Sequence, residues 1–65
     1  MRKSKKDYEQ FLNEIGEEMS FDDLVNNYGH LPKTSLVNGK LGTAIRRHDP
    51  IMFNCGYNDW LDSLS

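Results

Sequence analysis

The residues best suited to bind a metal ion are His30, His48 and Cys55. They lie far apart in the chain, and no C-x-x-C or H-x-x-x-H pair places two of them together. Structural zinc sites are usually built from such closely spaced pairs, because each pair supplies half of the tetrahedral coordination. The spacing therefore predicts no metal site, and no other pattern in the sequence indicates a cofactor.

Catalysis would need a nucleophile beside a base, or two carboxylates held in different environments. Cys55 could be activated by His48, but its position toward the interior of an apolar helix favours a buried, structural thiol. Asp59 and Asp62 share one helical face, yet they fall in the last turn of that helix, where a solvated face is expected. The glycines form neither a phosphate-binding loop nor a dinucleotide fingerprint. We therefore expect no catalytic residues and a protein that is not an enzyme.

Cys55, Asp59 and Asp62 lie in a predicted helix over residues 50–64. Asp49 can accept hydrogen bonds from the first free N–H groups, and Pro50 has a preset φ at the first helical position. Apolar side chains at helical spacing fall within an arc of roughly 100° around the helix axis. They are Phe53, Tyr57, Trp60, Leu61 and Leu64. Further apolar side chains lie off this arc, namely Ile51, Met52 and Cys55. The start of the helix thus carries more apolar surface than one buried face requires.

Two earlier helices have clear start signals. Ser4 and Ser20 are each followed three residues later by an aspartate, the pattern in which a hydroxyl and a carboxylate cap the first helical turn. Apolar residues at helical spacing follow each serine, so we predict helices over residues 4–18 and 21–28, the second one ending at Gly29.

The segment over residues 29–42 is rich in glycine and proline and is expected to be a connector without a helix. Asn38-Gly39 is a strong hairpin signal, but its flanks are short, so we predict a turn or a minimal hairpin near residues 36–41. Residues 43–48 should then form a helical turn or two. This helix should end before Pro50, because the residue before a proline disfavours the α conformation.

These patterns together predict an all-α fold: a single domain of three to four helices over residues 1–65, with a disordered basic start at residues 1–3. The core is expected to contain Tyr8, Phe11, Leu12, Ile15, Phe21, Leu24, Val25, Ile45, Phe53, Tyr57, Trp60 and Leu61. A chain of 65 residues has a small core. We therefore expect a protein partner, or a second copy of the chain, to cover part of its apolar surface.

Composition narrows the classes of protein that remain. The net charge is −2, with 8 Lys and Arg against 10 Asp and Glu, which argues against a surface built wholly for polyanions. The single cysteine excludes an intramolecular disulfide and favours a reducing, cytoplasmic setting. No apolar run approaches the roughly 18 residues of a membrane span, so no membrane association is expected.

The C-terminal third, residues 45–64, resembles the tails of small uncharacterised proteins encoded by bacteriophages and prophages. The resemblance rests on an isoleucine-arginine pair, an Asp-Pro step, an aromatic, a glycine and an Asp-Trp-Leu-Asp ending. The matching residues are Ile45, Arg46, Asp49, Pro50, Phe53, Gly56, Tyr57, Asp59, Trp60, Leu61 and Asp62. It implies an origin in a phage or another mobile element, and no particular activity.

The functional hypothesis from these observations is a non-enzymatic interaction factor of a phage or mobile element that binds and modulates a host protein. The predicted partner-binding residues are Arg46, Arg47, Asp59, Trp60 and Asp62. The helix dipole disfavours aspartates in a last turn, so either a basic partner or pairing with Arg46 or Arg47 within one monomer would explain their presence. The alternative hypothesis is a small nucleic-acid-binding regulator with a basic face over residues 40–47.

Overall fold

The structure, a computed structural model, describes residues 3–37 and 39–64. In this part of the chain there are five helices and no strand. The helices are α1 (Lys5–Glu18), α2 (Phe21–Tyr28), α3 (Lys33–Leu36), α4 (Leu41–His48) and α5 (Pro50–Leu64). The predicted all-α class is confirmed, with one helix more than expected.

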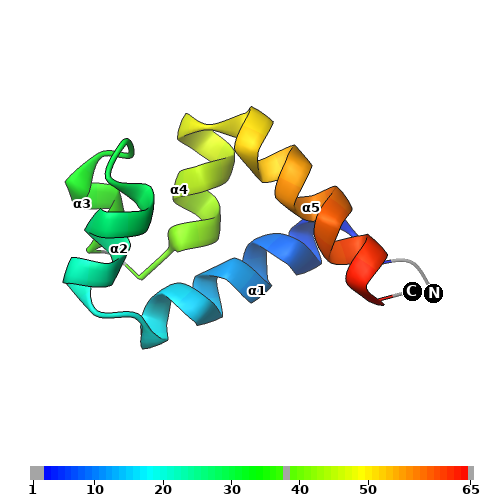
Figure 1. Cartoon of the computed structure of the whole chain (residues 1–65), viewed down its shortest axis with the longest axis horizontal. Helices are drawn as coiled ribbons and strands as arrows, with labels where there is room; N and C mark the ends of the chain where they lie inside the picture. Colours follow the sequence, from blue (N-terminus) through cyan, green and yellow to red (C-terminus); the bar gives the residue numbers. More distant parts are fainter. Residues whose placement is uncertain (1–2, 38, 65) are drawn as a thin grey trace.

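The helices form an elongated body of 34 × 22 × 17 Å (Figure 1). α1 runs along one side and makes its largest contact with α4, which in turn packs against α5. α2 and α3 lie together at the C-terminal end of α1, whereas the start of α1 and the end of α5 meet at the opposite end. The fold therefore has two ends that are built from different segments.

The first two helices begin where the capping residues predict. Ser4 Oγ accepts a hydrogen bond from Asp7 N (3.2 Å), and the Asp7 carboxylate accepts one from Ser4 N (2.9 Å). The hydrogen bond that the Asp7 carboxylate accepts from Ser4 N, and a second one from the Ser4 hydroxyl (3.1 Å), lower the pKa of Asp7 from its usual value. Ser20 Oγ accepts a hydrogen bond from Asp23 N in the same way (3.2 Å). Both predicted helices are confirmed within a residue at each end.

The segment after α2 differs from the sequence prediction. The expected connector over residues 29–42 contains the short helix α3, and α4 begins at Leu41, two residues earlier than predicted. The described residues form no strand here, while Asn38 of the predicted turn lies outside the described residues. Gly39 has a φ of +70°, a left-handed conformation that glycine adopts without strain, and it turns the chain into α4.

The early start of α4 has a tertiary cause. Asn13 Oδ1 on α1 accepts hydrogen bonds from Gly42 N (2.7 Å) and Thr43 N (3.2 Å), so a side chain of another helix caps α4. A Cβ atom at residue 42 would collide with the Glu9 carbonyl oxygen, so only glycine allows the two helices this close. Local sequence patterns do not reveal a cap that comes from a distant helix.

The core is centred on the contact between α1 and α4 and extends to the other three helices. Its buried members are Tyr8, Leu12, Leu24, Leu31, Leu36, Leu41, Ala44, Ile45 and Phe53. The predicted burial of Phe11 and Phe21 is wrong, because their side chains are 39% and 44% exposed. Among the other predicted core residues, several are only half-buried: Ile15, Val25, Tyr57, Trp60 and Leu61.

The last helix, α5, follows the predicted bounds, and Asp49 caps it: Asp49 Oδ1 accepts a hydrogen bond from Met52 N (3.2 Å). Residues 1 and 2 of the expected disordered start lie outside the described residues. The carbonyl oxygen of Lys3 accepts a hydrogen bond from the Tyr57 hydroxyl (2.5 Å), which links the chain just before α1 to α5.

Candidate functional site

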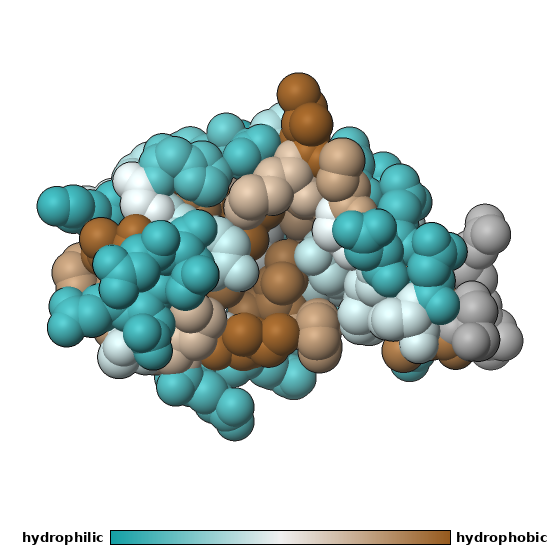
Figure 2. All heavy atoms as spheres, in the orientation of Figure 1, coloured by the Kyte–Doolittle hydropathy of each residue, from teal (hydrophilic) through white to brown (hydrophobic). Residues whose placement is uncertain are grey.

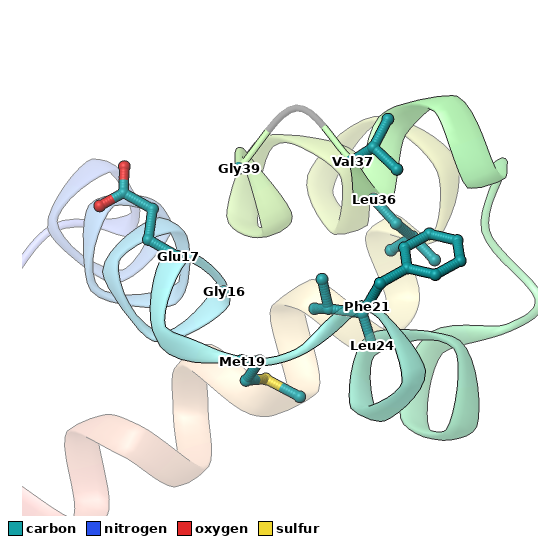
Figure 3. A pocket seen from close by; sticks show the side chains of 8 residues that line it. All are labelled: Gly16, Glu17, Met19, Phe21, Leu24, Leu36, Val37 and Gly39. Atoms are coloured by element: carbon teal, nitrogen blue, oxygen red, sulfur yellow. The ribbon is translucent and has the colours of Figure 1, made fainter.

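An open apolar pocket of about 420 Å³ lies where the end of α1 meets α2 and the segment after α3 (Figure 3). Its lining residues are Gly16, Glu17, Met19, Phe21, Leu24, Leu36, Val37 and Gly39. In Figure 3 the residues of α1 form one wall, and the apolar side chains of α2 and α3 form the facing wall. We call this feature the α1–α2–α3 pocket.

The local structure explains how the apolar wall arises. Ser20 caps α2, so Phe21 is its first residue and Leu24 follows almost one turn later, with its side chain buried. Leu36 ends α3 and is also buried, whereas Val37 directly after it is 63% exposed. The pocket thus has a buried leucine floor and a rim on which Phe21 and Val37 are accessible to a partner.

The chain segments that form the α1 wall and the start of α2 are acidic, and one of their carboxylate residues, Glu17, lines the pocket. No lysine or arginine occurs in the sequence between Lys6 and Lys33, whereas five acidic residues fall within residues 14–23: Glu14, Glu17, Glu18, Asp22 and Asp23. All five are exposed. The ion pairs found in residues 3–37 and 39–64 join His30 to Asp49 and Arg46 to Glu9, so none of them neutralises this acidic run.

The two arginines predicted to bind a partner have different surroundings. Arg46 Nε lies 2.9 Å from Glu9 Oε1, and Glu9 Oε2 accepts a hydrogen bond from the Thr43 hydroxyl (2.6 Å). Arg46 is therefore held against α1 by Glu9. Arg47 is exposed and lines a smaller, more polar hollow of about 250 Å³. The other residues of that hollow are Ser35, Lys40, Thr43, Ala44 and His48.

The three predicted residues of α5 lie elsewhere. Trp60 is half-buried and stacks on Phe11, with ring centroids 5.3 Å apart and an angle of 23° between the rings. Asp59 and Asp62 are exposed on the same stretch of α5. A helix rises about 1.5 Å per residue, so this stretch lies roughly 15 Å along α5 from its start beside Arg46 and Arg47. The structure does not bring the arginines and the aspartates into one cluster.

The residues considered for metal binding or nucleophilic chemistry are also dispersed. In the part of the chain that the structure describes, no group of three or more His, Cys, Asp or Glu side chains could hold a metal ion. His30 Nε2 lies 3.0 Å from Asp49 Oδ2. The predicted burial of Cys55 is wrong, because α5 packs on the core through the side that carries Phe53, which leaves the thiol exposed.

The pocket itself was missed at the level of sequence. The sequence pattern predicts Phe21 in the core and Val37 in a connector, whereas the pocket exists only where three separate segments meet. One signal was available, because the acidic run over residues 14–23 contains the apolar residues Met19 and Phe21. Figure 2 shows one face of the molecule, which is mostly polar, with hydrophobic atoms gathered near its centre and others projecting at its upper edge. The pocket lies toward the α2 and α3 end, at the left of this view, and is drawn in Figure 3.

Comparison of the chain with protein-family models, curated proteins and solved structures gives no match. Within the described residues, no helix combines the length and the apolar character needed to cross a membrane.

Proposed function

We propose that this chain is a non-enzymatic protein-interaction factor that takes an apolar segment of its partner into the α1–α2–α3 pocket. The observation that carries the proposal is the exposure of Phe21 and Val37 at the rim of an open pocket with a buried leucine floor. Single exposed apolar side chains are ordinary on protein surfaces, but apolar side chains grouped around a pocket are typical of binding sites. Burial of such a group gives a partner its main contact energy.

The resemblance of residues 45–64 to phage and prophage proteins supports a host protein as the partner. On this proposal the chain acts in the bacterial cytoplasm and modulates the host protein by occupying one of its surfaces. The small core is consistent with this role, because a chain of 65 residues gains stability when a partner covers its remaining apolar surface.

The test is affinity capture from host lysate with three tagged forms of the chain: wild type, Val37→Ser and Ile51→Ser. Ile51 is the matched control, because it is 77% exposed and lies on α5, outside the pocket. The proposal expects a protein that the wild type and Ile51→Ser retain and that Val37→Ser loses by at least about tenfold. Equal retention by all three forms would contradict it.

The α5 stretch with Asp59, Trp60 and Asp62 remains the competing surface for the same function. Its aromatic residue has a structural partner, since Trp60 stacks on Phe11, but Asp62 lies in the last turn of α5, where the helix dipole disfavours it. Capture with Asp59→Asn/Asp62→Asn distinguishes the two surfaces. Retention of the partner by this variant and its loss by Val37→Ser would assign the interface to the pocket.

A second candidate function is nucleic-acid binding, favoured by Lys40, Arg47 and His48, which line one polar hollow. Phosphate groups are bound by such clusters in a salt-dependent manner. Arg46 contributes less than the sequence suggests, because Glu9 already neutralises it. A gel-shift at low salt with wild type and Lys40→Ala/Arg47→Ala tests this function: salt-sensitive retention that the double variant loses would favour it over protein binding.

A further inference from the structure

We infer that the segment bound in the α1–α2–α3 pocket is a basic peptide segment that carries large apolar side chains flanked by lysine or arginine. The inference deepens the proposed function and rests on it. It follows from three observations: the pocket with its apolar lining side chains, the acidic residues in and next to the segments that line it, and the lack of any structural reason for two of those acidic residues.

The apolar part of the recognition comes from the pocket. Its volume of about 420 Å³ falls within the range of pockets that bind small ligands, and it suits one or two large side chains rather than an extended surface. The lining residues Met19, Phe21, Leu24, Leu36 and Val37 offer thioether, aromatic and aliphatic contacts. A partner side chain such as leucine would replace water mainly over Phe21 and Val37, the two lining residues with large exposed apolar surface.

The basic part of the recognition comes from the rim. Glu17 lines the pocket itself, and Glu18, Asp22 and Asp23 are exposed next to it along the chain. The described part of the chain places no cation in an ion pair with any of them. A partner with lysine or arginine beside its apolar side chain would therefore meet negative charge at Glu17 and in the adjoining segments, which favours association and selects against acidic segments.

The fold gives no reason for Glu17 and Glu18. They lie in the last turn of α1, where the helix dipole disfavours negative charge, and no basic residue accompanies them there. Glu14 is three and four residues before them, and like charges at these spacings repel on a helix. Asp22 and Asp23 differ, because the first turn of α2 favours them. Glu17 and Glu18 thus destabilise α1, and a basic partner is the reason to keep them.

The experiment uses four synthetic twelve-residue peptides. Two of them carry leucines one helical turn apart, and their charged residues are all lysines in one and all glutamates in the other. The other two are the same peptides with alanine in place of each leucine. Binding to the full chain is measured by fluorescence anisotropy in low salt and in 300 mM NaCl. We expect binding only of the leucine-lysine peptide, weakened by salt because rim charges are screened.

Variants of the chain locate the binding. Glu17→Gln/Glu18→Gln should weaken the leucine-lysine peptide by up to about fivefold for each carboxylate removed and should at the same time raise the melting temperature. Asp62→Asn removes one negative charge from the competing α5 surface: the inference expects no change in affinity, and a loss of affinity in this variant would place the peptide on α5 and overturn the inference. Val37→Ser should abolish detectable binding, because it removes an apolar rim residue.

Several outcomes would overturn the inference. Equal binding of the leucine-glutamate peptide would show that charge is irrelevant; the pocket and the proposed function would then stand if capture depends on Val37. Binding of the leucine-lysine peptide unchanged in Val37→Ser would place it elsewhere on the acidic surface. Self-association of the free chain that Val37→Ser abolishes would make the occupant a second copy. Absence of binding by all four peptides would also contradict the inference.

Discussion

His30 Nε2 lies 3.0 Å from Asp49 Oδ2, so the residue that caps α5 is also linked to the loop after α2. The other carboxylate oxygen, Asp49 Oδ1, accepts the hydrogen bond from Met52 N at the start of α5. One side chain therefore links the α2–α3 unit beside the pocket to the start of the long C-terminal helix.

The first prediction concerns this cap. Asp49→Ala should destabilise the chain by about 0.5–2 kcal/mol, whereas Asp49→Asn should change little, because asparagine is an equally good N-cap and still offers an oxygen to Met52 N. His30→Ala should cost at most about 1 kcal/mol, since the pair is partly exposed. Urea unfolding of the three variants measures the differences. An unchanged midpoint for Asp49→Ala would contradict the assigned cap.

The second prediction concerns Gly56 in the middle of α5. Alanine there would gain about 1 kcal/mol of helix propensity, but its methyl group would collide with the Tyr8 hydroxyl. Overpacking costs about 1–3 kcal/mol, so Gly56→Ala should be net destabilising. Adding Tyr8→Phe removes the colliding oxygen and should restore stability, relative to Tyr8→Phe alone as the control. Thermal melts would contradict this account if Gly56→Ala melted higher than wild type.

Much of the fold could be predicted from local sequence, because local contacts determine the helix starts. Ser4, Ser20 and Asp49 each cap the helix that follows them, and all three caps were readable as short patterns. Local sequence patterns did not predict α3 or the early start of α4. The cap of α4 comes from Asn13, which lies far away in sequence and reaches α4 only after the chain has folded.

The errors in burial have a related cause. Phe11 and Phe21 lie on apolar helical faces, but those faces are wider than the surface that the neighbouring helices cover. Leu31, Leu36 and Leu41 are buried although glycine and proline break the helical period around them. The same irregular segment provides one wall of the pocket. Sequence periodicity therefore did not indicate the candidate site, which depends on tertiary contacts.

The third prediction concerns Cys55. Its exposure implies that a thiol reagent should modify the native chain nearly as fast as the urea-unfolded chain. Modification should leave the melting temperature nearly unchanged, and Cys55→Ser should alter stability by less than about 0.5 kcal/mol. Stopped-flow labelling provides the rates. Strong protection of the native thiol, by a factor of a hundred or more, would mean that α5 packs differently from the structure.

The fourth prediction is a pH dependence at Tyr8. Burial, with smaller contributions from the charges of Tyr28 and Asp59, raises the pKa of the Tyr8 hydroxyl above its ordinary value of 10.0. The folded chain disfavours the tyrosinate. The protonated Tyr8 hydroxyl therefore makes its full contribution to stability below pH 10, and this contribution is lost as the pH rises through the raised pKa of the folded state.

This pH dependence can be measured in Tyr28→Phe/Tyr57→Phe, in which Tyr8 is the remaining tyrosine. Absorbance titration should give a midpoint above 10.0 for the folded chain, because burial is the largest cause of the shift. The same titration in urea provides the unfolded reference. Equal midpoints in the two states would contradict the burial of this hydroxyl.

The central claim is that the α1–α2–α3 pocket holds the partner. The most direct measurement is a methyl NMR spectrum of the labelled chain with and without the purified partner from the capture experiment. The account predicts that the methyl signals of Met19, Leu24, Leu36 and Val37 shift on binding, while that of Ile51 stays in place. Shifts confined to the signals of the α5 stretch around Trp60, with the four pocket methyl groups unmoved, would contradict it.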